Sequence, residues 1–178
     1  MPADAPEPDI IVFDGLTNDV HQGFIRENPG SLTALDEFDP ACFDSDTYAG
    51  CFESTIAEFR RHWPSVPIIY LAVHRNGGQS YDDQLTARRL ALGACSKWNV
   101  AVADVWADSD LDTRRTADRE RYSFDALGCD GLPGTPETIT YSQPDTQPSG
   151  THPNFPAIDR FYTPVLGEKI SFVIEGLR

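Results

Sequence analysis

Positive charge is scarce in this sequence. Fourteen lysines and arginines stand against 28 aspartates and glutamates in 178 residues, which gives a formal net charge of -14. A surface of that sign repels phosphate backbones and anionic lipid headgroups. We therefore expect neither nucleic acid nor a membrane among the partners of this protein.

Long apolar runs and paired-cysteine motifs are also missing. No apolar stretch approaches the roughly 20 residues that a helix needs to cross a bilayer, and the first residues lack the basic and apolar segments of a secretory signal. The four cysteines show no CxxC spacing, which argues against a zinc site. Cys42 and Cys51 flank a short loop and would be able to pair in an oxidising compartment, so the compartment stays open.

Nucleotide-binding signatures are absent as well. No glycine-rich phosphate loop or dinucleotide fingerprint follows an apolar run, which disfavours a flavodoxin-like domain that binds a phosphorylated cofactor. The sequence implies neither a metal ion nor an organic cofactor. Its length fits a single domain with a core of its own.

Three short apolar runs predict buried parallel strands. They cover residues 9–13, 66–73 and 100–105, and each is rich in Val, Ile, Leu or Ala. Such runs are typical of strands that are covered on both faces. Because three strands leave an edge strand without a neighbour, we expect that the domain lacks its first strands or meets a partner there.

Helical periodicity separates these runs. One predicted helix spans 48–63 and stops at Pro64, a second opens at Ser80, and a third follows residue 158 with a bend at Thr163-Pro164. The alternation of strands and helices predicts an α/β fold with a flavodoxin-like, three-layer parallel sheet. Residues 107–150 show little periodicity, and a loop of that length is usually functional or mobile.

Polar segments follow each predicted strand. Ligands of open parallel sheets bind outside the carboxyl ends of the strands, where this chain has residues 14–19, 74–78 and 104–110. From the second segment we expect His74, Arg75 and Asn76 to line a substrate pocket.

Two motifs carry a family resemblance. "GLTND" at residues 15–19, directly after a strand, resembles the GxND block of SGNH (GDSL-type) hydrolases, and "SGTHPN" at residues 149–154 resembles their DxxHPN block. The resemblance implies one domain over residues 1–178 and an esterase- or lipase-like activity on small acyl esters such as carbohydrate esters. It implies that Asn18 donates to the oxyanion and that His152 is the general base. In the first motif we also expect Gly15 and Asp19 to lie beside the substrate, with hydrogen bonding to the neighbouring backbone as the alternative role of Asp19.

These implied roles agree with the chemistry of the two side chains. An amide N–H aimed at a developing oxyanion lowers the barrier by about 3–4 kcal/mol. Histidine takes and returns the proton of a serine hydroxyl near neutral pH.

The sequence also departs from the family pattern. Leu16 stands where the family has a glycine, and Ser149 stands where it has the aspartate that supports the imidazolium. Asp145 is close in sequence, but nothing assigns it that role. The nucleophilic serine of the GDS block has no counterpart, because the chain begins at what would be the third strand of the family.

Ser80 and Ser109 are the two other candidates for a nucleophile. Ser80 fits better as a helix N-cap, and the carboxylates of Asp108 and Asp110 would oppose an alkoxide at Ser109. The leading interpretation is therefore an N-terminally incomplete serine esterase, whose serine comes from a missing N-terminal segment or from an oligomer partner. The alternative is a non-catalytic module of the same descent that binds a glycan or a protein.

Overall fold

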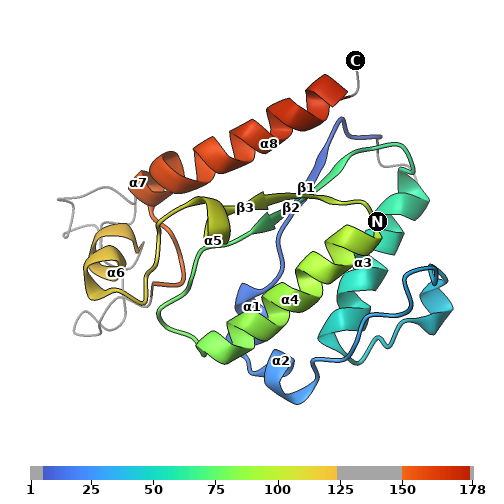
Figure 1. The fold of residues 1–178 in the computed structure, drawn as a ribbon, viewed down its shortest axis with the longest axis horizontal. Coiled ribbons are helices and arrows are strands. Elements are labelled where there is room, and N and C mark those ends of the chain that lie inside the picture. The colour runs from blue at the N-terminus through green and yellow to red at the C-terminus, as the bar shows by residue number, and fades with distance from the viewer. Residues whose placement is uncertain (1–5, 124–149, 177–178) are drawn as a thin grey trace.

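The computed structural model describes residues 6–123 and 150–176. A three-stranded parallel sheet crosses the molecule, and helices cover both of its faces (Figure 1). Its strands are β1 (Ile11–Phe13), β2 (Ile68–Ala72) and β3 (Ala101–Asp104), in the order β1-β2-β3. The predicted α/β class and the parallel sheet are confirmed, and the layering is compatible with a flavodoxin-like fold.

Strand β2 is the centre of the sheet. Ile69 lies opposite Val12 of β1 on one side and Ala101 of β3 on the other. Ile68, Ile69 and Tyr70 are all buried, because both neighbouring strands and both helical layers cover them. This explains why residues 66–73 read as a continuous apolar run.

One face of the sheet is covered by two long helices, α3 (Tyr48–His62) and α4 (Tyr81–Lys97). Both begin at capping side chains: the Thr47 hydroxyl accepts the backbone N–H of Gly50, and the Ser80 hydroxyl accepts that of Asp83. Helix α3 ends two residues before Pro64, as its sequence predicts. The larger core lies between these helices and the strands.

A buried ion pair joins α3 and α4. The ammonium of Lys97 lies 2.6 Å from the carboxylate of Glu53, and both side chains are fully buried. Glu53 also accepts the backbone N–H of Thr33, and Phe38 lies under the Lys97 ammonium at 5.2 Å. Residues 33–38, which precede α3 in the chain, are thereby held against the two long helices.

The opposite face is covered by the C-terminal helices. Helix α7 (Phe155–Ala157) leads through one π-helical turn, η4 (Ile158–Tyr162), into α8 (Thr163–Gly176), which contacts β2 and β3. The predicted irregularity near Thr163 is thus a π-helical turn that ends just before it. A second apolar cluster forms here around Phe161 and Tyr162.

Short helices occupy segments in which the sequence predicts neither a helix nor a strand. They are α1 (Thr17–His21), α2 (Phe24–Glu27), η1 (Pro40–Cys42), α5 (Val105–Asp108) and α6 (Thr116–Tyr122). Each is too short for its apolar periodicity to be visible in the sequence. Helices α1 and α5 follow β1 and β3 directly, so they present polar residues at the carboxyl ends of those strands.

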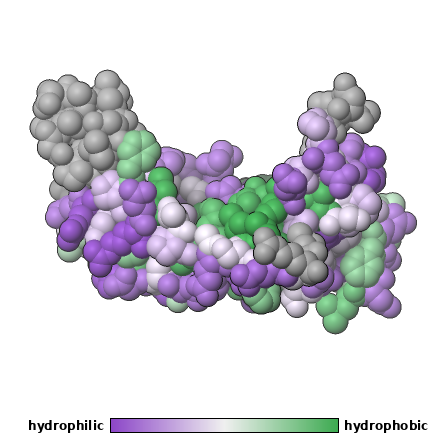
Figure 2. Space-filling model, turned by 90° about the horizontal axis from the view of Figure 1, so that it is seen from above, coloured by the Kyte–Doolittle hydropathy of each residue, from purple (hydrophilic) through white to green (hydrophobic). Residues whose placement is uncertain are grey.

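Both edges of the sheet are open within the described residues, since β1 and β3 each pair only with β2 there. Val12 of β1 is 41% exposed, and Phe172 and Ile174 of α8 are 70% and 39% exposed. Seen from the α8 side, apolar surface gathers in the middle of the molecule (Figure 2). Within residues 6–123 and 150–176, no helix has the length and hydropathy to cross a membrane.

Candidate active site

The turn after β1 is fixed by two tyrosines. The backbone carbonyl of Gly15 accepts the hydroxyl of Tyr48 at 2.8 Å and that of Tyr70 at 3.2 Å. Leu16, at the family's glycine position, is 4% exposed and belongs to the core. The next residues form α1, so Asn18 lies in the first turn of a short helix at the carboxyl end of β1.

The segment that carries His152 is held from both of its ends. On the N-terminal side, the carbonyl of Gly150 accepts the hydroxyl of Thr113 at 2.6 Å. On the C-terminal side, the fully buried Asn154 accepts the backbone N–H of Ala157 at 3.0 Å and donates to the carbonyl of Arg121 at 2.9 Å. His152 itself is exposed between these two anchors.

Asn154 is a structural residue that the sequence analysis overlooked. It caps α7, whose first turn contains a proline. An asparagine followed closely by proline at a helix start is the signal that would have identified the cap. In this chain the last residue of the "HPN" motif therefore fixes the loop that presents His152.

His74 is a third anchor of the segment that carries His152. It is 1% exposed, and burial lowers its pKa to about 4, so the imidazole is neutral at pH 7. The Gly150 carbonyl can only accept, so Nε2–H of His74 donates to it at 2.9 Å. Nδ1 then accepts the hydroxyl of Tyr162 at 2.6 Å.

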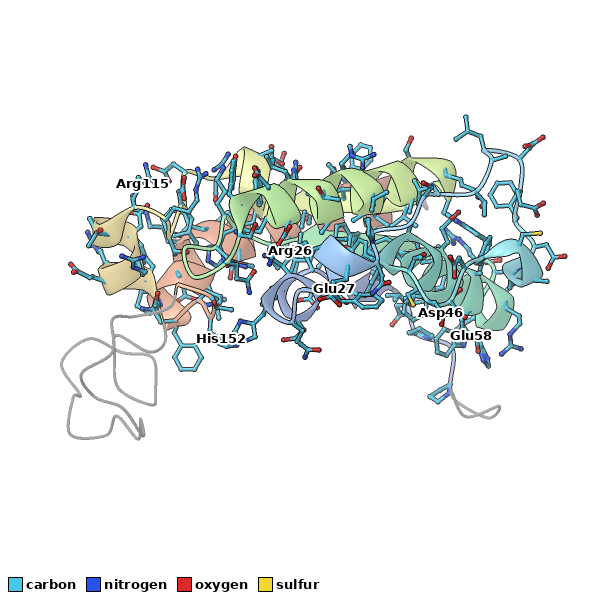
Figure 3. The ribbon with its side chains drawn as sticks, turned by 90° about the horizontal axis from the view of Figure 1, so that it is seen from below. Arg26, Glu27, Asp46, Glu58, Arg115 and His152 are labelled. Atoms are coloured by element: carbon cyan, nitrogen blue, oxygen red, sulfur yellow. The ribbon has the colours of Figure 1, made fainter. Side chains whose placement is uncertain are left out.

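Asn18 and His152 line one cavity. It measures about 350 Å³ and lies where β1 ends, and its wall also contains Asp14, Gly15, Leu16, Thr17, Asp19, Val73, Thr151, Pro153 and Tyr162. Figure 3 shows His152 on the same side of the molecule as α1. Segments from the two ends of the chain therefore meet in a single polar cavity at the carboxyl edge of the sheet, the usual place for a ligand in this architecture.

Carboxylates dominate the charge of this cavity. Asp14 and Asp19 lie in its wall, whereas none of the residues that line it is a lysine or an arginine. Burial raises the pKa of Asp19, and burial also raises the pKa of Tyr162, with a smaller contribution from Asp14. The cavity therefore favours neutral or cationic groups over anionic ones.

A smaller cavity of about 170 Å³ lies on the other side of the same turn. It shares Asp14, Gly15 and Asp19 with the first, and its remaining wall is formed by Phe13, Tyr48, Cys51, Phe52 and Thr55. Cys42 and Cys51 are both exposed free thiols in this structure, so no disulfide joins them. Cys95 is also a free thiol, and it is buried.

The structure places the other predicted substrate contacts behind the cavity. His74 and Asn76 are buried and absent from its wall, because their polar groups bind the protein itself. Arg75 lies over the ring of Trp106 at 5.4 Å, away from the cavity. Gly15 and Asp19 do line it. The structure therefore does not bring residues 74–76 into the wall of this cavity, and their contact with substrate stays a prediction.

Neither of the two candidate nucleophiles, Ser80 and Ser109, lines the cavity. Ser80 caps α4, and the Ser109 hydroxyl donates to the carbonyl of Val105 at 2.7 Å. Ser149 and Asp145 lie outside the described residues. The hydroxyl-bearing residues in the wall of the cavity are Thr17, Thr151 and Tyr162, and the sequence motifs point to none of their hydroxyls.

The described residues suit proton transfer and hydrogen bonding more than metal chemistry. Within residues 6–123 and 150–176, no three side chains of His, Cys, Asp or Glu gather in a way that would hold a metal ion. The side-chain amide of Asn18 and the imidazole of His152 share one cavity. In enzymes, an amide N–H serves to stabilise a developing oxyanion and an imidazole serves as a general base.

Comparison with known proteins identifies the fold but no family. No family model and no curated protein matches the chain. A crystal structure of a protein from Lactobacillus plantarum is similar, with a TM-score of 0.61 and 17% identity, over 99% of this chain and 69% of that protein. A second crystal structure gives the same score and identity over 94% and 66%. The chain thus spans about two thirds of the length of each, and at this identity the likeness concerns the fold alone.

Proposed function

We propose that this chain is the part of an SGNH-type serine ester hydrolase that supplies the oxyanion donor and the general base. The observation that carries the proposal is the shared cavity of Asn18 and His152, which come from the two motifs that resemble the family. Either motif alone occurs by chance in many proteins. Their meeting at the carboxyl edge of a parallel sheet supports the pair as a site.

The two side chains have distinct roles in the proposed reaction. His152 accepts the proton of a serine hydroxyl as that oxygen attacks the ester carbonyl, and it later returns the proton to the departing alcohol. The side-chain amide of Asn18 donates to the oxyanion of the tetrahedral intermediate. A water molecule, activated by the same histidine, then hydrolyses the acyl-enzyme.

The serine of this proposal comes from a further parallel strand. The free edge of β1 offers backbone N–H and C=O groups for such a strand. A strand parallel to β1 would end beside Asp14 and Gly15, at the wall of the cavity. An N-terminal segment or a partner chain that binds this edge would therefore deliver a Gly-Asp-Ser turn to Asn18 and His152.

The proposed substrate is a small acyl ester without a negative charge close to the ester bond. A cavity of about 350 Å³ admits a small polar molecule or one sugar unit of a glycan. Asp14 and Asp19 would repel a carboxylated or phosphorylated substrate. Neither a metal ion nor an organic cofactor is needed for this chemistry.

Covalent labelling with a fluorophosphonate tests the proposal. We predict that the 178-residue chain acquires no stoichiometric adduct, because a donor and a base without a nucleophile do not activate a hydroxyl. After extension at the N-terminus by a strand that bears a Gly-Asp-Ser turn, mass spectrometry should find the adduct on that serine. It should vanish in His152→Ala and persist in His21→Ala, whose exposed ring lies in α1 but not in the wall of the cavity.

Two outcomes would overturn it. Stoichiometric labelling of Ser80, Ser109, Thr17 or Thr151 in the short chain would mean a different nucleophile. An adduct on the added serine that survives His152→Ala would remove the general base.

The second candidate is a non-catalytic module that binds a glycan or a protein. The sequence favours it through Ser149, which replaces the family's aspartate, and through the missing GDS block. The open edge of β1 gives such a module a surface for a protein partner. If the second candidate is right, the extended chain should fold and should acquire no adduct.

A further inference from the structure

We propose that the loop between β2 and α4, residues 73–80, is the positioning element of this site, with His74 and Gln79 as its two positioning residues. The inference rests on the proposed roles of Asn18 and His152. Each of the two segments that carry these residues is hydrogen-bonded to an opposite end of this loop.

The His74 end holds the segment of His152. Nε2–H of His74 donates to the carbonyl of Gly150, two residues before His152. Gly150 has a φ of 74°, and a Cβ at that position would lie 2.6 Å from the Thr113 hydroxyl oxygen, so only glycine fits there. The other ring nitrogen orients Tyr162, whose side chain lines the cavity.

The Gln79 end holds the helix of Asn18. The side-chain amide of Gln79 donates to the carbonyl of Thr17 at 3.0 Å, one residue before Asn18. Its own oxygen accepts the amide of Asn76 at 3.3 Å, which fixes the orientation of the group. A single loop thus contacts both walls through one side-chain donor at each end.

Hydrogen bonds and close packing hold residues 76 and 77 of this loop in place, so its two ends keep a fixed separation. The fully buried Gln84 of α4 forms two hydrogen bonds of 2.9 Å with the backbone of Asn76, accepting its N–H and donating to its carbonyl. Gly77 lies so close to Thr113 that a Cβ would approach the Thr113 carbonyl oxygen to 2.1 Å. The backbone N–H of Gly77 also donates to the Thr113 hydroxyl at 3.0 Å.

This architecture has a catalytic consequence. A donor and a base must be held within about 0.5 Å of the productive geometry, and a misplacement of about 1 Å costs on the order of 100-fold in rate. Asn18 and His152 are exposed side chains on short segments, so their mutual position depends on what holds those segments. The hydrogen bonds of His74 and Gln79 hold both segments to one loop, in addition to the anchors that Thr113 and Asn154 give to the segment of His152.

Replacement of His74 by two different amides separates its two bonds. The amide N–H of glutamine reaches the place of Nε2 and keeps a donor for Gly150, whereas the oxygen of asparagine reaches the place of Nδ1 and keeps an acceptor for Tyr162. We expect the ring signals of His152 in NMR spectra to move in His74→Asn and to stay in His74→Gln. The side-chain amide signals of Asn18 should stay in both.

The reciprocal variant is Gln79→Met, which keeps the shape of the side chain and removes the donor to Thr17. It should move the Asn18 amide signals and leave the His152 ring unchanged. Gln22→Met, at the exposed C-terminal cap of α1, is the matched control and should move neither. A loss of stability alone would move the signals of both residues together.

The proposal is overturned if His74→Asn and Gln79→Met move the same signals, or move no signal beyond the Gln22→Met control. This measurement uses the 178-residue chain and needs no serine, so its outcome is independent of the labelling result. In a chain extended by the serine-bearing strand, Gln79→Met should lower kcat about 100-fold with KM nearly unchanged. His74→Gln should retain more of the activity than His74→Asn.

Discussion

The behaviour of His74 follows from its burial. An imidazolium in this position would lose its hydration, so burial lowers the folded-state pKa of His74 to about 4, against 6.5 in an unfolded chain. Below pH 6.5 the unfolded state therefore binds a proton that the folded state does not bind. The stability that His74 contributes is complete above pH 6.5 and is lost as the pH falls toward 4.

A measurement of unfolding against pH checks this prediction. Between pH 7 and pH 4 the free energy of unfolding should fall by about 3 kcal/mol more in the wild type than in His74→Gln, which has no titrating ring. Urea denaturation at the two pH values gives both differences, and carboxylates that titrate in the same range cancel in the comparison. Equal falls in the two proteins would show that His74 is protonated in the folded state.

The sequence predicts some residues of the candidate site and not others, and the difference depends on whether the residue stands in a local motif. Asn18 and His152 stand in short motifs that follow a strand and precede a helix, so their place at the edge of the sheet follows from local order. Gln79 and Tyr162 enter through contacts between segments far apart in the chain. No local pattern distinguishes such residues from ordinary polar or core residues. The position of residues 74–76 after a strand predicts contact with substrate, but whether a residue in that position enters the cavity or the core depends on the same distant contacts.

At the scale of elements, the pattern of burial decides which parts the sequence reveals. Strand β2 is buried along almost its whole length, and helices α3 and α4 each bury one face over most of their length. Their apolar runs and periodicities are therefore long enough to recognise in the sequence. The sequence also predicts the C-terminal helix and an irregularity near Thr163, although none of the residues of α8 is fully buried. It does not predict the form of that irregularity, a π-helical turn over Ile158–Tyr162, because the apolar period of a helix does not report one extra residue in a turn.

Strand β1 yields a prediction at this scale. The backbone N–H of Ile11 donates to the carbonyl of Pro67 at 2.9 Å, and successive amides of a strand point to opposite sides. Thus the amides of Ile11 and Phe13 face β2, and that of Val12 faces the open edge. Hydrogen exchange of the isolated chain should show protection at Ile11 and Phe13 and fast exchange at Val12. Strong protection of Val12 would mean that another strand already covers the edge.

At the scale of the whole molecule, two features have opposite effects on association. The net charge of -14 causes copies of the chain to repel one another, and the apolar, unpaired edge of β1 favours their pairing. Salt screens the repulsion over about 10 Å at 0.1 M and about 3 Å at 1 M, but it does not weaken backbone pairing or apolar contact.

We therefore predict that the chain is mainly monomeric at low salt and associates as salt is raised at neutral pH. Sedimentation velocity at a fixed protein concentration measures the change in average mass. Val12→Lys places a charge on the 41%-exposed position at the centre of β1 and should keep the protein monomeric at every salt concentration. The matched control is Leu35→Lys, because Leu35 is 81% exposed in the segment between α2 and α3, away from β1. If Leu35→Lys suppresses association as well as Val12→Lys does, then the contact surface is not the edge of β1, and a strand that brings the serine would have to bind elsewhere.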